Sequence, residues 1–166
     1  HPSAPSAADW QFEADVQGVP GGLGLRYLLR GEVGRLRLGN DRGRGRELWK
    51  QTCCEAFLAP AGATGYFEFN FTPSGAWAAY RFDARRQGMQ PLDLPRPPDI
   101  TTSRDDRRLE VTVQLALPFA SGAWRLGLAA VLEEQVGTMS YWALAHPGPQ
   151  PDFHDPAGFL LDIAAA

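Results

Sequence analysis

The chain has 166 residues, of which 44% are hydrophobic and 21% charged, and its formal net charge at pH 7 is −3. This length predicts a single domain over residues 1–166, and the lack of a basic excess argues against nucleic acid as a partner. The 18 glycines and 14 prolines argue against a helical bundle, because both residue types weaken the interior of a helix.

Short runs of alternating apolar and polar residues, which are typical of half-buried β-strands, recur along the whole chain. Turn-forming glycines and prolines separate many of these runs. The predicted strands cover residues 10–16, 23–29, 36–38, 52–58, 66–71, 77–83, 109–117, 124–132, 139–145 and 159–163. Many short strands joined by turns predict an all-β fold, an antiparallel β-sandwich.

Two segments interrupt the strand pattern. Residues 40–46 are rich in arginine and glycine, and we expect a solvated loop there rather than a phosphate site. Residues 84–108 contain four prolines and form an unusually long connection. Such a connection is either a lid or binding loop, or a plain excursion on the surface.

The only two cysteines, Cys53 and Cys54, are adjacent in the sequence. Because neighbouring side chains of a strand point to opposite faces, a disulfide between them would distort the peptide. We therefore expect two reduced, buried thiols, which fit a reducing compartment. No signal peptide and no apolar run of membrane-spanning length is present, so the expected location is the cytoplasm, with no membrane partner.

Three strands in the middle of the chain, at residues 52–58, 66–71 and 77–83, are predicted to form a meander. The expected register places Glu55 opposite Glu68, with Arg81 one diagonal step away and Asn70 on the same face. Two directly opposed glutamates repel, so they need solvent, a cation, a shared proton or a metal. One interpretation is an outer sheet face with an ion pair. The other is the polar floor of a sugar site with aromatic walls.

Five stretches carry a family resemblance: residues 48–58 (LWKQTCCEAFL), 66–80 (YFEFNFTPSGAWAAY), 141–144 (YWAL), 146–147 (HP) and 151–154 (PDFH). They resemble the bacterial DOMON-like proteins, which are similar to the family-nine carbohydrate-binding modules. This resemblance implies a β-sandwich with jelly-roll character. It also implies a structural calcium ion, although the sequence contains no Asp-rich loop of the kind that holds calcium.

The same resemblance implies a binding site for a small, sugar-like ligand. The sugar-binding modules hold a terminal sugar between two Trp rings, with a Glu six residues after the first Trp. Trp49 and Glu55 keep that spacing, Trp142 is the expected second ring, and Arg81 is the candidate for the hydrogen-bonding arginine. We therefore expect a non-catalytic binding module without cofactor, and the sequence does not indicate its oligomeric state. The predicted ligand-binding residues are Trp49, Glu55, Glu68, Asn70, Arg81, Trp142 and His146.

Two other functions stay open at this stage. If Glu55 and Glu68 are directly paired, their spacing suits a retaining glycoside hydrolase. The third class is a haem-binding electron-transfer domain, because some relatives with the DOMON fold hold haem through Met and His. The residues that offer such ligands are Met89, Met139, His146 and His154.

Overall fold

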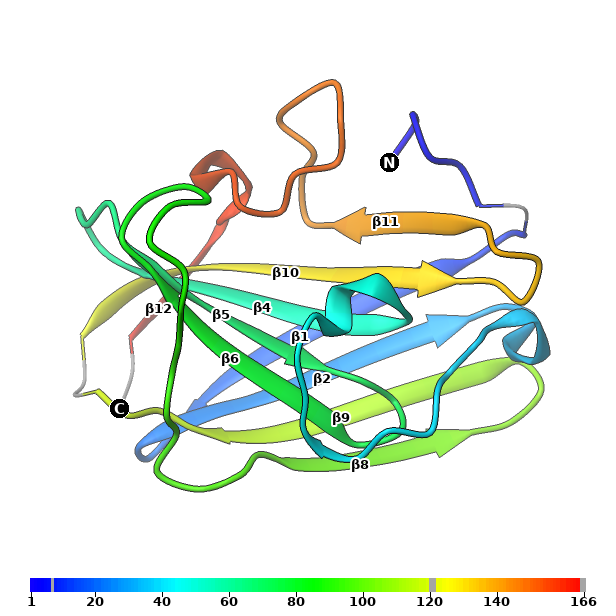
Figure 1. The fold of residues 1–166 in the computed structure, drawn as a ribbon, viewed down its shortest axis with the longest axis horizontal. Helices are drawn as coiled ribbons and strands as arrows, with labels where there is room; N and C mark the ends of the chain where they lie inside the picture. The colour runs from blue at the N-terminus through cyan, green and yellow to red at the C-terminus, as the bar shows by residue number, and fades with distance from the viewer. Residues whose placement is uncertain (7, 120–121, 165–166) are drawn as a thin grey trace.

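The computed structural model describes residues 1–6, 8–119 and 122–164, which form two β-sheets packed face to face (Figure 1). The helices within these ranges are single 3-10 turns, η1 (Val33–Arg35), η2 (Leu48–Lys50) and η3 (Pro156–Gly158). The predicted all-β sandwich is confirmed.

The smaller sheet has the strand order β1-β2-β9-β8, and every neighbouring pair in it is antiparallel. Its strands are β1 (Gln11–Val19), β2 (Gly22–Arg30), β8 (Asp99–Arg104) and β9 (Arg108–Ala116). The side chains of Leu109, Val111, Val113 and Leu115 in β9 are buried at every second position, as the alternating pattern predicted.

The larger sheet has the strand order β11-β10-β4-β5-β6-β3, with β12 beside β10 and β7 beside β6. Its pairs are antiparallel except for the short parallel pair of β3 and β6. Its strands are β3 (Gly43–Arg44), β4 (Cys53–Pro60), β5 (Tyr66–Phe71), β6 (Ala76–Phe82), β7 (Gln90–Pro91), β10 (Ala123–Glu133), β11 (Met139–Ala143) and β12 (Leu161–Ala164).

The main core lies between the two sheets. Phe69 and Phe71 of β5 are fully buried there against apolar side chains of the smaller sheet such as Val111 and Val113. Burial of such a phenylalanine contributes about 2 kcal/mol before the entropy cost. The opposite face of the larger sheet carries a second cluster, which η2 and the segment after β11 cover. It is this second face that holds the cavity described below.

The predicted meander forms as β4, β5 and β6, but its register differs from the prediction. Glu55 lies opposite Asn70 rather than opposite Glu68. Glu68 lies between Phe57 of β4 and Tyr80 of β6. The expected direct pairing of the two glutamates is therefore wrong, and they are diagonal neighbours on adjacent strands.

The turn between β5 and β6 explains why the side chains of β6 lie on the faces opposite to the predicted ones. The backbone N–H of Thr72 donates to the carbonyl of Ala76 over 2.9 Å, so the loop has three residues. Its last residue, Gly75, has φ +98°, which suits the left-handed position of a three-residue hairpin loop. One extra loop residue moves every β6 side chain to the other face. Tyr80 therefore lies on the face of Glu68, and Arg81 lies on the opposite face.

Three further expectations can be compared with the structure. The segment 36–38 is not a strand, since Leu36 forms only an isolated bridge to Glu134. The long connection at 84–108 is not a plain loop, because it contains β7 and the edge strand β8, whose Ile100 packs on the core. The two cysteines are free and buried, as predicted. In the described part of the chain, no helix has the length and apolar character needed to cross a membrane.

Candidate functional site

A cavity of about 310 Å³ lies on the outer face of the larger sheet, which is the size of a small-molecule site. Its polar lining consists of Glu55 from β4, Glu68 from β5, and Arg86 and His154 from two loops. Its main aromatic lining consists of Trp49, Phe82, Tyr141 and Phe153. Strands of the sheet thus provide a carboxylate floor, and rings from separate segments stand around it.

The short helix η2 places the Trp49 ring beside this floor. The residue before it, Glu47, has a left-handed backbone with φ +52°, which turns the chain as the helical turn begins. The ring of Trp49 then packs edge-to-face on Tyr80, with ring centroids 5.8 Å apart. In Figure 1 this turn lies across the strands β4, β5 and β6, which agrees with the contacts of η2.

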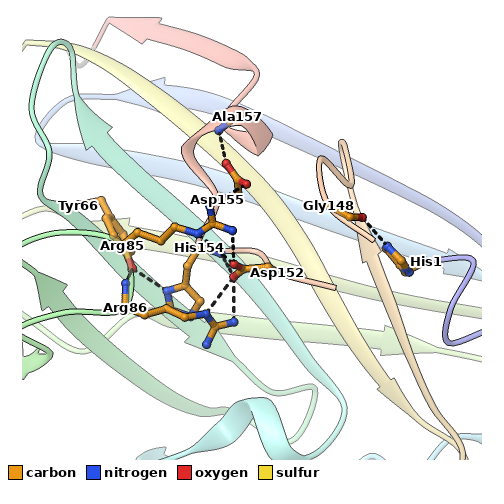
Figure 2. Close-up of polar contacts among 9 residues, drawn as sticks. All are labelled: His1, Tyr66, Arg85, Arg86, Gly148, Asp152, His154, Asp155 and Ala157. Atoms are coloured by element: carbon orange, nitrogen blue, oxygen red, sulfur yellow. Dashed lines mark hydrogen bonds and ion pairs between the residues drawn. The ribbon is translucent and has the colours of Figure 1, made fainter. Parts of the chain in front are cut away.

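Two loops from distant parts of the chain meet at the cavity. Asp152 accepts hydrogen bonds from Arg85 over 2.6 Å and from Arg86 over 2.8 Å, one arginine at each carboxylate oxygen. Arg85 also pairs with Asp155 over 3.0 Å. Figure 2 shows these contacts between the loop that follows β6 and the segment that follows β11. We call this group of four residues the ion-pair latch, because it joins the two segments.

Glu55 is the most unusual side chain of the cavity. It is 2% exposed, and its Oε1 atom has no hydrogen-bond partner among the described residues. Burial, together with the charge of Glu68, raises the pKa of Glu55 well above its usual range. An unpaired carboxylate oxygen in a buried position is costly unless a ligand, a water molecule or a proton satisfies it.

Glu68 lies next to it and is held by Asn70. The side-chain amide of Asn70 donates to Glu68 Oε1 over 2.7 Å. Burial raises the pKa of Glu68 to about 7, although the hydrogen bond from Asn70 and the charge of Arg86 act in the opposite direction. Near neutral pH the two glutamates therefore carry less than two negative charges.

A chain of hydrogen bonds leads from Arg86 of the ion-pair latch through Tyr66 to His154 (Figure 2). The backbone N–H of Arg86 donates to the Tyr66 hydroxyl over 3.1 Å, and that hydroxyl lies 2.7 Å from His154 Nδ1. Burial, and then the charge of Arg86, lowers the pKa of His154 to about 4, so the ring is neutral at pH 7. When its Nδ1 accepts from Tyr66, its Nε2–H faces Glu68 Oε2 at 3.8 Å, and this contact is not an ion pair.

Four of the seven predicted ligand-binding residues are gathered at this site. Trp49, Glu55 and Glu68 line the cavity, and Asn70 lies fully buried beside them. Glu55, Glu68 and Asn70 share one face of the neighbouring strands β4 and β5, as the period of two along each strand requires, and η2 adds Trp49 from outside the sheet.

The structure places the other three predicted residues elsewhere. Arg81 lies on the opposite face of β6 and is half exposed. Its Nη1 atom lies 3.7 Å from Asp83 Oδ1. Trp142 packs into a cluster at one end of the sandwich, and its Nε1 donates to Ser140 over 3.1 Å. His146 lies against the ring of His1, with centroids 4.7 Å apart, outside the cavity lining.

Arg86, Tyr141 and Phe153 line the cavity but are not among the predicted ligand-binding residues, and His154 was expected only as a candidate haem ligand. Tyr141, rather than its neighbour Trp142, faces the cavity. Adjacent residues of a strand point to opposite faces, so only one of the two can do so. Phe153 and His154 belong to the PDFH stretch quoted above for the resemblance, which was the available signal. Arg86 lies in the long connection, where no periodic pattern assigns a side chain to a face.

No group of three or more His, Cys, Asp or Glu side chains in the described ranges could hold a metal ion. These residues therefore offer no set of side-chain ligands for the calcium ion that the resemblance implies. Among the candidate haem ligands, Met89 and His154 line the cavity, whereas Met139 and His146 do not.

Comparisons with known proteins establish the fold. The structure is similar to that of a Bacteroides uniformis ATCC 8492 protein whose carbohydrate binding is itself an inference, with a TM-score of 0.72 and 15% identity. The match covers 98% of this chain and 80% of that protein. The two chains share a fold.

Two further matches are weaker. They are structures of a family-nine carbohydrate-binding module from Caldicellulosiruptor kristjanssonii, one in complex with glucose and one with cellotriose. The TM-scores are 0.41 and 0.43, both identities are 14%, and each match covers 85% of this chain and 68% or 67% of the module. No protein-family model and no curated protein matches the sequence.

Proposed function

We propose that this chain is a non-catalytic module that binds a small, sugar-like ligand in the cavity over β4 and β5. The observation that carries the proposal is the buried Oε1 atom of Glu55, which has no partner among the described residues and belongs to a side chain that lines the cavity. A ligand hydroxyl that donates to this oxygen would remove the cost of leaving it unpaired.

The surroundings of Glu55 suit a sugar. The rings of Trp49 and Tyr141 offer apolar faces for the C–H surface of a pyranose, while the carboxylates and Arg86 offer partners for its hydroxyls. The Bacteroides uniformis protein, for which carbohydrate binding has been inferred, supports this assignment through the shared fold.

The register of the two glutamates removes the direct pairing on which the alternative, a retaining glycoside hydrolase, was based. A retaining enzyme needs two carboxyl groups about 5–5.5 Å apart, and direct pairing across two strands was the arrangement expected to supply that spacing. Glu55 instead lies opposite Asn70. Both glutamates are positioned on rigid strands, with Asn70 holding Glu68, which suits a preorganised binding floor.

Titration with glucose and cellobiose, followed by tryptophan fluorescence and calorimetry, tests the proposal. We expect ring contact to change the emission of Trp49, and Trp49→Ala to weaken binding by about tenfold or more. Trp142→Phe and Arg81→Ala are matched controls outside the cavity, and both should bind as the wild type does. Equal affinity of Trp49→Ala and wild type, or no binding across a broad panel of sugars, would refute the proposed site.

A further inference from the structure

The charges around the cavity do not balance. Arg86 is the only arginine or lysine in the described lining, and Asp152 of the ion-pair latch already pairs with it. Arg85, the next cation, pairs with Asp152 and Asp155. Since the two acids of the latch match its two arginines, the described lining holds no further arginine or lysine to pair with Glu55 and Glu68.

The lining is also of the kind that holds cations. The rings of Trp49, Phe82, Tyr141 and Phe153 surround a floor that contains carboxylates. The face of an aromatic ring attracts a cation, and desolvation inside a cavity strengthens this attraction. An ammonium group brings three donors and one positive charge, and it therefore matches an unpaired carboxylate oxygen better than a neutral hydroxyl does.

We propose that the natural ligand of this cavity carries an ammonium group, as an amino sugar does, and that this group binds at Glu55 and Glu68. The inference rests on the proposed function and sharpens it, because it names the charge of the ligand. The orphaned oxygen of Glu55, its 2% exposure and the surrounding rings are the independent observations that support it.

Binding of an ammonium group should also change the protonation of Glu55 and Glu68. Without a ligand, burial keeps the pKa values of both glutamates above their usual range, so the pair carries less than two negative charges near pH 7. The neighbouring charges on other elements are those of Arg86 and the rest of the ion-pair latch, while His154 is neutral. An ammonium group stabilises the ionised carboxylates, so its binding releases a proton from the pair. A neutral sugar brings no charge that would cause this release.

Calorimetry on the full chain with glucosamine, N-acetylglucosamine and glucose separates the possibilities. Measurements at about pH 5 and pH 7 keep the glucosamine amine charged, since such amines titrate near 7.7–8.0. At pH 7 we expect glucosamine to bind about tenfold or more tightly than the other two sugars. Its affinity should fall toward pH 5, and buffers of different ionisation enthalpy should reveal the released proton.

Substitutions of the two glutamates identify which carboxylate binds the ammonium group. Glu55→Gln should reduce the affinity for glucosamine more than that for glucose, and Glu68→Gln provides a second test if the first variant does not fold. Glu13→Gln, on β1 of the other sheet, is the matched control and should keep the wild-type preference. If glucose binds as tightly as glucosamine, the inference is wrong while the proposed function stands. If none of the three sugars binds, both are wrong.

Discussion

The substitution Glu68→Gln should make the protein more stable relative to the wild type as the pH rises from about 4.5 to 8. Burial raises the pKa of Glu68 from 4.5 to about 7 in the folded chain. Between these values the folded state keeps a proton that the unfolded state has lost, so the free energy of unfolding falls as the pH rises. The free energy of unfolding falls by about 3 kcal/mol in total, since each pKa unit corresponds to about 1.4 kcal/mol.

Glutamine is a suitable replacement because its carbonyl oxygen still accepts the hydrogen bond from Asn70 while the side chain no longer titrates. Urea unfolding, followed by circular dichroism at several pH values between 4.5 and 8, gives the stability difference between variant and wild type. That difference should grow by about 3 kcal/mol across the range. Glu13→Gln, with an exposed side chain on β1, controls for the loss of a carboxylate.

A difference that stays constant with pH would refute the reasoning. It would mean that Glu68 ionises in the folded protein as it does in the unfolded chain, and therefore that the floor of the cavity is well solvated. The release of a proton on ammonium binding, which depends on the raised pKa of Glu68, would then lose its basis.

Two further predictions concern the elements that shape the site. Gly75→Ala should destabilise the fold by about 1–2 kcal/mol in urea unfolding, because alanine is strained at φ +98°. The control Gly34→Ala, at a position with open space and no positive φ, should change stability by less than about 0.5 kcal/mol. Asp152→Asn, which removes the shared acid of the ion-pair latch, should lower stability by about 1–3 kcal/mol and speed trypsin cleavage at the paired arginines. Asp93→Asn, which affects an exposed pair, should have little effect, and equal behaviour of the two variants would show that the latch is unimportant.

Much of the fold could be predicted because a strand has a period of two. The alternation in residues 109–117 identified β9, and the apolar and turn residues located the β4–β5–β6 meander. The edge strand β8 was missed because it has only one core-packed apolar residue, Ile100, and it pairs with a single neighbour. The formation of such an edge strand depends more on pairing with its neighbour than on its own pattern of apolar residues.

The candidate site was predictable only in part for the same reason. Period two along β4 and β5 correctly placed Glu55, Glu68 and Asn70 on one face, but it could not supply the loop length that orients the next strand. One additional residue before Ala76 moved Arg81 to the other side of the sheet.

The sequence alone determined the all-β class, most strand positions and the carboxylate floor, because these follow from short-range periodicity along single strands. Only the tertiary structure decided which rings and cations surround that floor. Arg86 and Asp152 are far apart in the sequence, and their contact depends on how two loops meet over a completed sheet. Such contacts are set by strand register and loop geometry together, so a local sequence pattern does not reveal them.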